Sequence, residues 1–231
     1  MQYFQPMHSL KNTAQKTCCD RCGSCCRQGG PALHTQDREL FTDNLLCPEH
    51  LITVRRGELA YQPMAQHPQP VTDEFLKVAG KRGDWCCRFY DHAAKKCTIY
   101  GNRPIACGLF DCTSPEEILA ITGKDLLTRF DLIEINDPLL SIVKDHEKQC
   151  PCPDFLSLPE QLARDKQTTL ERLTPAVRLD LDIRATAAYK KALSVELEMF
   201  YFGRPLFQLL RPFGIVLSET DQGVCLHSVA E

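Results

Sequence analysis

Hydrophobic residues recur at helical spacing through the second half of the chain. From Pro159 to about residue 200, apolar side chains return every three or four positions among charged neighbours, which predicts helix. Pro175 lies within this stretch and predicts an interruption, because proline lacks the N–H that a helix interior needs. Two further helices are predicted, one at 114–121, where Ser114 and Glu117 have the spacing of a capping box, and one around 138–143.

The first half of the chain lacks this periodicity. Short strands are predicted at 51–54 and 58–61, and a short helix is predicted to open near Thr35. Residues 62–70 contain three prolines, which predict an exposed loop. The pattern as a whole predicts an α+β fold, in which a loop-rich half with short strands packs against a mainly α-helical C-terminal half.

The cysteines divide the chain more sharply than the hydrophobic pattern does. Thirteen of the fourteen lie before residue 153, and only Cys225 follows. We therefore predict a cysteine-rich region at 1–113 and a mainly helical region at 114–231, packed together as one unit.

Composition argues that these thiols are not disulfide staples. A chain of 231 residues that is 43% hydrophobic can bury a substantial core without them. The first residues show no apolar signal-peptide core, and no apolar run approaches the roughly 20 residues that span a bilayer. A cytoplasmic protein is therefore expected, and in that compartment dense cysteines indicate metal or redox chemistry.

The densest cysteine motif is CCDRCGSCC at 18–26. Two residues between cysteines let a tight turn aim both sulfurs at one metal, and Gly23 supplies the backbone freedom for such a turn. Bacterial ferredoxin motifs begin with the same two spacings, so an iron–sulfur cluster is one candidate. The ferredoxin motif then has three residues, a cysteine and a proline, whereas here the next cysteine is adjacent and Arg27 follows.

A second group of cysteines begins about sixty residues later. Cys87, Cys97 and Cys107 recur at ten-residue intervals, and Cys112 follows. With the first motif they make eight well-placed thiols, enough for two four-ligand sites or one polynuclear site, and more than one structural zinc needs.

Together these motifs resemble a known family. The first motif, followed by W-x-C-x-F, C-x-I-Y-x-x-R-P and a further cysteine, is similar to the YkgJ-type cysteine-cluster proteins, which are described as zinc- or iron-chelating. The similarity covers roughly residues 18–112, and Cys18 and Cys86 lie beside matched positions, so either could replace its neighbour. The ligands that the resemblance implies are Cys19, Cys22, Cys25, Cys26, Cys87, Cys97, Cys107 and Cys112.

The remaining candidates receive structural interpretations. His34 and His92 lie near the cysteine groups and could be ligands, but ordinary surface histidines are favoured. The pair Cys150 and Cys152 has a poor spacing for one tetrahedral metal and is interpreted as incidental. Cys47 and Cys225 are expected to be small buried hydrophobes.

Three functions remain open from the sequence. The favoured hypothesis is an iron–sulfur protein, with one or two clusters, that acts in electron transfer or redox sensing. The alternatives are a zinc-stabilised interaction module without catalysis and an iron-dependent enzyme of unknown substrate; family members are labelled iron–sulfur oxidoreductases. No familiar catalytic motif is present, so no catalytic residue is predicted. A protein or redox partner is expected, whereas the net charge of −3 favours neither nucleic acid nor membrane as a partner.

Overall fold

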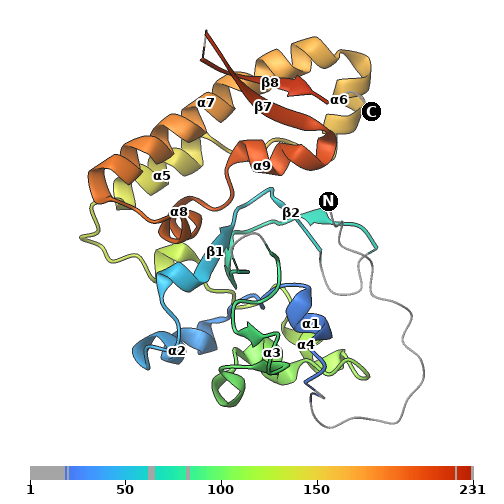
Figure 1. Ribbon diagram of the computed structural model, residues 1–231, viewed down its shortest axis with the longest axis vertical. Helices are drawn as coiled ribbons and strands as arrows, with labels where there is room; N and C mark the ends of the chain where they lie inside the picture. The colour runs from blue at the N-terminus through green and yellow to red at the C-terminus, as the bar shows by residue number, and fades with distance from the viewer. Residues whose placement is uncertain (1–18, 20, 62–65, 82–83, 222, 230–231) are drawn as a thin grey trace. The chain divides into compact units, whose positions relative to one another are not determined.

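A computed structural model of the protein describes residues 19, 21–61, 66–81, 84–221 and 223–229. The chain divides into two compact units and runs back and forth between them. Short strands combined with helices confirm the predicted α+β class (Figure 1). None of the helices in the described residues is both long and apolar enough to cross a bilayer. Unit 1 comprises Met1–Ile52, Tyr61–Pro68 and Phe75–Thr128, and unit 2 comprises Thr53–Ala60, Gln69–Glu74 and Arg129–Glu231.

Unit 1 is built from short elements joined by loops. Strand β1 is where predicted, and the helix predicted near Thr35 is a 3-10 helix, η1. β1, whose first two residues belong to this unit, pairs with β4, and β5 pairs with β6. Its elements are α1 (Ser24–Arg27), η1 (Thr35–Arg38), α2 (Glu39–Thr42), η2 (Pro48–His50), β1 (Leu51–Val54), β4 (Phe75–Val78), β5 (Tyr90–Asp91), β6 (Lys96–Cys97), η3 (Tyr100–Asn102), α3 (Ile105–Leu109) and α4 (Glu116–Ile121).

Three fully buried leucines from distant segments hold the centre of unit 1 together. The N–H of Leu33 donates to the carbonyl of Leu76, that of Leu76 to Leu127, and that of Leu127 to Leu33, at 2.7–2.9 Å. The same three residues thus bury apolar side chains and satisfy one another's backbone groups, as a buried segment requires.

The helix predicted at 114 is present, but it begins differently from the prediction. α4 starts at Glu116, after Pro115, and the Ser114 hydroxyl donates to the Glu116 carboxylate rather than capping the backbone. The predicted capping box is therefore wrong, because a nearer carboxylate competes for the hydroxyl.

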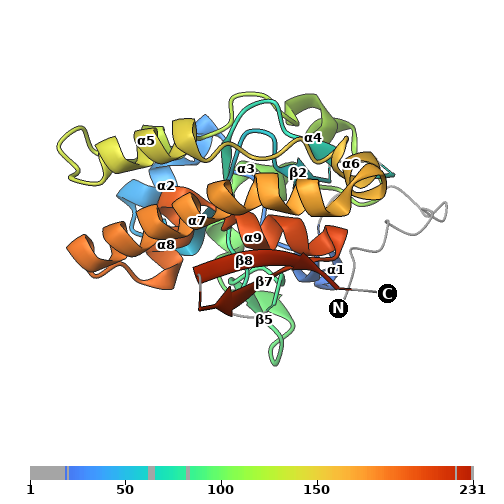
Figure 2. The same ribbon diagram turned by 90° about the horizontal axis from the view of Figure 1, so that it is seen from above.

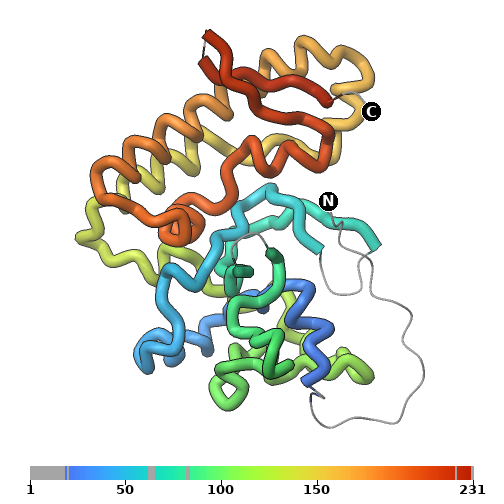
Figure 3. The backbone as a smooth tube through the Cα atoms, in the orientation of Figure 1, coloured from blue at the N-terminus to red at the C-terminus, as the bar shows by residue number. Residues whose placement is uncertain are grey.

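Unit 2 is mainly helical and contains two strand pairs (Figure 2). β2 pairs antiparallel with β3, and β7 pairs antiparallel with β8 in a hairpin that lies along α7 (Figure 3). Its elements are β2 (Leu59–Ala60), β3 (Gln69–Pro70), η4 (Arg129–Asp131), α5 (Leu140–Gln149), α6 (Leu158–Arg164), α7 (Lys166–Lys191), α8 (Val195–Phe202), α9 (Leu206–Leu210), η5 (Arg211–Phe213), β7 (Ile215–Thr220) and β8 (Gly223–Ser228).

Two predictions about proline fail in unit 2. α7 continues through Pro175, although an internal proline costs about 3 kcal/mol. The helix packs along its length against α5, α6, α9 and β8, and this packing outweighs the lost hydrogen bond. Gln69 and Pro70, predicted as loop, form β3, because a proline is tolerated in a strand at the edge of a sheet; residues 62–65 of that loop lie outside the described residues.

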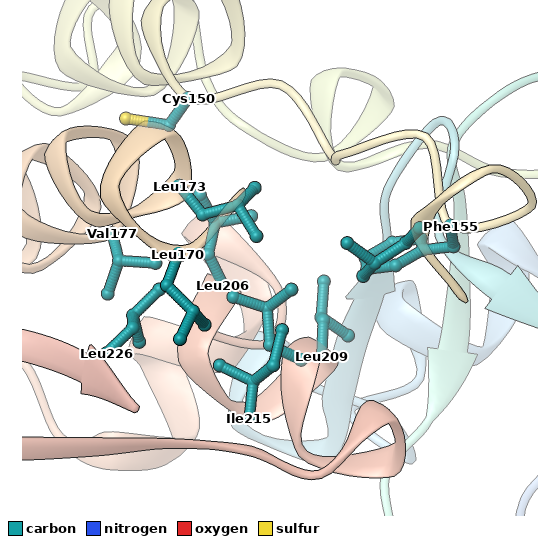
Figure 4. Packing of buried hydrophobic residues seen from close by; sticks show 11 residues of the cluster. Cys150, Phe155, Leu170, Leu173, Val177, Leu206, Leu209, Ile215 and Leu226 are labelled. Atoms are coloured by element: carbon teal, nitrogen blue, oxygen red, sulfur yellow. The ribbon is translucent and has the colours of Figure 1, made fainter. Parts of the chain in front are cut away.

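The hydrophobic core of unit 2 lies between α7, α9 and the β7–β8 hairpin. Leu170, Leu173 and Val177 on one face of α7 meet Leu206 and Leu209 of α9 (Figure 4). Complete burial of each such side chain contributes about 1.5–3 kcal/mol. Cys150 belongs to this core as a buried free thiol, which fits its interpretation as incidental.

A buried carboxylate ties the helices of unit 2 together. Asp180 on α7 is fully buried; its Oδ1 lies 2.6 Å from Nε2 of His146 on α5 and accepts from Nε of Arg184 at 2.8 Å. Its Oδ2 accepts the N–H of Leu206 at the start of α9, at 2.8 Å. Arg184 also donates to the carbonyl of Phe202, so one charged cluster fixes four helices.

A second buried network joins the two inserted segments to the helices of the same unit. Arg55 and Arg129 are fully buried, and both donate to the carboxylate of Glu147 on α5. Arg129 also donates to Glu74 at 2.8 Å. Because breaking a buried pair leaves an unpaired buried charge, this network explains why 53–60 and 69–74 belong to unit 2.

The burial of His146 predicts a pH-dependent stability for unit 2. Burial lowers the pKa of His146 below its usual 6.5, although the hydrogen bond with Asp180 opposes this. Below pH 6.5 His146 is therefore protonated in the unfolded chain but stays neutral in the folded unit until the pH is lower. The free energy of unfolding should fall as the pH drops from about 6.5. Urea unfolding between pH 8 and 5 measures the effect. His146→Gln should be less stable at pH 8 and should show a flatter dependence; an equal slope in both proteins would contradict this explanation.

Candidate metal centre

The first cysteine motif forms a tight turn that leads into a one-turn helix. Gly23 has φ of 76° and precedes α1, which carries Cys25 and Cys26. The N–H of Arg27 donates to the carbonyl of Gly23 at 2.9 Å, and the N–H of Gln28 donates to that of Cys25 at 3.0 Å. The turn thus places two cysteines on the helix and leaves Cys22 immediately before it.

Gly23 also sets the distance between this motif and the β5–β6 hairpin. A Cβ atom at Gly23 would clash with the ring and Oη of Tyr90, so that one of the two would have to shift. Tyr90 is buried on β5 and is paired with Cys97 on β6. The missing side chain therefore lets the first motif lie directly on the hairpin that carries Cys97.

A backbone hydrogen bond joins the two cysteine motifs. The N–H of Cys87 donates to the carbonyl of Cys26 at 2.7 Å, and Cys87 also forms an antiparallel bridge with Gly80. The second motif is thereby held at the first by main-chain atoms as well as by side-chain packing.

Cys107 is positioned by a buried aspartate from a distant segment. Oδ1 of Asp37 accepts the N–H of Ile105, the first residue of α3, and Oδ2 accepts the N–H of His34, both at 2.8 Å.

His34 is itself buried, and its Nδ1 lies 2.9 Å from the carbonyl oxygen of Lys124. The interpretation of His34 as a surface histidine is therefore wrong, since it is a buried structural residue. Nothing in the cysteine pattern indicates Asp37, because it lies 68 residues from Ile105 in the sequence.

The sulfurs affect one another's ionisation. A hydrogen bond from the Cys26 thiol lowers the pKa of Cys25 to about 6. That same bond, together with burial and the sulfurs of Cys25, Cys87 and Cys107, raises the pKa of Cys26. Burial raises the pKa of Cys107 to about 12, with further contributions from Cys87, Cys25 and Cys97. Five thiols from separate segments therefore share one electrostatic environment.

Cationic side chains flank this environment. The guanidinium groups of Arg21 and Arg103 lie over the ring of Tyr100, 4.1 and 4.0 Å from its centroid. Arg103 also lowers the pKa values of Cys25 and Cys107, although it is a minor influence beside hydrogen bonding and burial. Positive charge beside the sulfurs favours the thiolate form that binds metal.

The structure brings together part of the predicted ligand set. Cys25, Cys26, Cys87, Cys97 and Cys107 form the coupled group, and the pKa of Cys22 responds to Cys25 as well as to its hydrogen bond with Ser24. Cys19 is half-buried and its sulfur accepts the N–H of Arg21, while Cys112 is exposed after α3. The place of Cys19 and Cys112 in the ligand set stays a prediction, and Cys18 lies outside the described residues.

Two further features of the described cysteines limit the chemistry. All thirteen are free thiols, which agrees with metal binding rather than disulfide bonding. Among the residues that the structure describes, the one group with three donor atoms within 4.8 Å of one another is Asp84, Cys86 and His92. No three of the described cysteine sulfurs therefore all lie within 4.8 Å of one another.

Comparison with known proteins identifies the same region. Residues 18–123 match the family model CxxCxxCC, which is described as a putative zinc- or iron-chelating domain. This match confirms the resemblance seen in the sequence. Searches among curated proteins and solved structures found no match to the chain.

The close approach of Gly23 to Tyr90 predicts that an added methyl group would disrupt the centre. Gly23→Ala combines an unfavourable positive φ with the clash against Tyr90, so we expect a loss of stability of at least about 1–3 kcal/mol and reduced metal content. Gly108→Ala is the matched control, because a Cβ there meets nothing within 4 Å. Metal per chain and thermal unfolding of both variants measure the effect; wild-type metal content in Gly23→Ala would show that the turn does not position the ligands.

Proposed function

Because residues 18–123 match the CxxCxxCC family model, we propose that unit 1 binds an iron–sulfur cluster through its coupled cysteines and acts in electron transfer or redox sensing. The observation that carries this proposal is the arrangement of the five thiols. They come from α1, from the bridge at Cys87, from β6 and from α3. Their charges act on one another, and no three of their sulfurs all lie within 4.8 Å of one another.

The spacing of the sulfurs supports a polynuclear centre. Four ligands at about 2.3 Å from one zinc ion lie roughly 3.8 Å from one another. In an iron–sulfur cluster the cysteines ligate different iron atoms, so their sulfurs stand farther apart. The candidate ligands are Cys22, Cys25, Cys26, Cys87, Cys97 and Cys107, with Cys19 and Cys112 added by the family pattern.

The surrounding residues give the centre its electrostatic support. Thiolates around a cluster carry excess negative charge, and Arg21 and Arg103 lie on one side to offset it. Tyr90 is buried beneath the first motif and excludes water from that side. An iron–sulfur cluster, when bound, supplies a one-electron couple whose potential depends on such charge, hydrogen bonding and exposure. A redox partner protein is the interaction that this function requires.

The proposal is tested by metal content and colour. Protein purified without oxygen should be brown and contain iron with acid-labile sulfide. Cys107→Ser and Cys22→Ser should each lower metal affinity by more than the roughly 10–100-fold that outer-shell changes cause, and should destabilise unit 1, because metal binding and folding are coupled.

Cys47→Ser is the matched control, since Cys47 lies in the same unit and its pKa responds to Glu49 rather than to the other cysteines. It should keep the wild-type iron content and spectrum. Colourless protein with stoichiometric zinc would replace the redox function by a zinc-stabilised interaction module. Unchanged metal in both Cys107→Ser and Cys22→Ser would overturn the ligand assignment.

A further inference from the structure

A second set of metal-binding side chains lies in unit 1, apart from the coupled cysteines. One ligand atom each from Asp84, Cys86 and His92 lies within 4.8 Å of the other two. Cys86 is buried at 1% exposure, whereas Asp84 and His92 are exposed. A buried thiol thus forms the floor of the group, and a carboxylate and an imidazole form its solvent side.

The backbone holds the first two residues in this arrangement. Oδ1 of Asp84 accepts the N–H of Cys86 at 3.1 Å, which fixes the carboxylate over the thiol and leaves its second oxygen for a ligand. The N–H of Lys81 donates to the carbonyl of Cys86 at 3.1 Å, and the N–H of Asp84 donates to the carbonyl of Lys81 at 2.9 Å. These bonds hold Asp84 and Cys86 beside Lys81.

The histidine reaches the group from a different element. His92 follows β5 at the turn of the β5–β6 hairpin, and its ring meets the edge of the Tyr90 ring at a centroid distance of 5.0 Å. Tyr90 is buried, so this contact restricts the orientation of an otherwise exposed imidazole. His92 of the hairpin turn and the segment 84–86 therefore bring their donor atoms within 4.8 Å of one another.

Cys86 and its neighbour Cys87 have different surroundings. Burial raises the pKa of Cys87, as do the charges of Cys97, Cys86 and Cys25, and the N–H of Cys87 donates to the carbonyl of Cys26. Burial also raises the pKa of Cys86, and the charged groups that act on it are Asp84, Lys81 and Arg27. The backbone bond to Cys26 and the charges of Cys97 and Cys25 favour Cys87 over Cys86 as the ligand that joins the other cysteines.

We propose that Asp84, Cys86 and His92 form a separate mononuclear zinc site with an open fourth position. One sulfur, one nitrogen and one oxygen ligand match the borderline softness of Zn²⁺, whereas iron–sulfur clusters require mainly thiolates. Ligands of a tetrahedral zinc lie roughly 3.3–3.8 Å apart, so small side-chain rotations close this group on an ion. Three protein ligands leave one position for water or a ligand molecule.

The test is the zinc content of full-length protein incubated with excess Zn²⁺ and then desalted. His92→Gln should contain one zinc per chain less than wild type, and Cys86→Ser should lose the same single ion. Because the measurement is a difference, it holds whichever metal the coupled cysteines take. His92 is exposed, so its substitution should leave the fold intact, which circular dichroism checks.

Two controls separate this site from the cysteine centre. His67→Gln removes another exposed histidine of unit 1 and should keep the full zinc content. Cys107→Ser should reduce the metal of the coupled cysteines, yet it should retain the zinc that His92→Gln removes. Equal zinc in wild type and His92→Gln would overturn the proposal, and so would loss of the cysteine-centre metal in Cys86→Ser, since Cys86 would then be a ligand of that centre.

Discussion

Several thiolates cannot share one small volume unless a cation compensates their charge, and unit 1 is arranged around this constraint. Without a metal ion, burial and mutual repulsion hold the pKa of Cys107 at about 12, while the pKa of Cys25 falls to about 6 because Cys26 keeps its proton. When one of these thiols loses its proton, its neighbours become harder to deprotonate. A bound metal would compensate the charge of the thiolates, so its binding would stabilise the folded arrangement of the segments that carry them.

Different interactions stabilise the two units. Unit 2 has the interdigitated apolar core around α7, reinforced by the charges at Asp180 and Glu147. Unit 1 has short elements, a small apolar centre at three leucines, and a set of free thiols. Backbone hydrogen bonds and the close approach of Gly23 to Tyr90, rather than long helices or strands, position the cysteines of unit 1.

The sequence predicts which side chains make up the site better than it predicts how they are arranged. Helical periodicity predicts helix in the region of α5, α6 and α7, although not the break between α6 and α7, and the cysteine spacings predict the matching family, since both signals are local. The continuation of α7 through Pro175 is not predictable locally, because packing from other elements decides it. The role of Asp37 is equally hidden, since it depends on Ile105, which only the tertiary fold brings near.

The insertion of 53–60 and 69–74 into unit 2 makes the two units inseparable by a single cut of the chain. A fragment beginning at Arg129 would contain every helix of unit 2, yet Arg129 would lose Glu74, Glu147 would lose Arg55, and Arg204 would lose Glu58. Gene fusion or truncation at the apparent boundary would thus give a helical fragment with unpaired charges inside it. An intact helical unit therefore requires the chain from residue 53 onward, which includes most of the metal-binding unit.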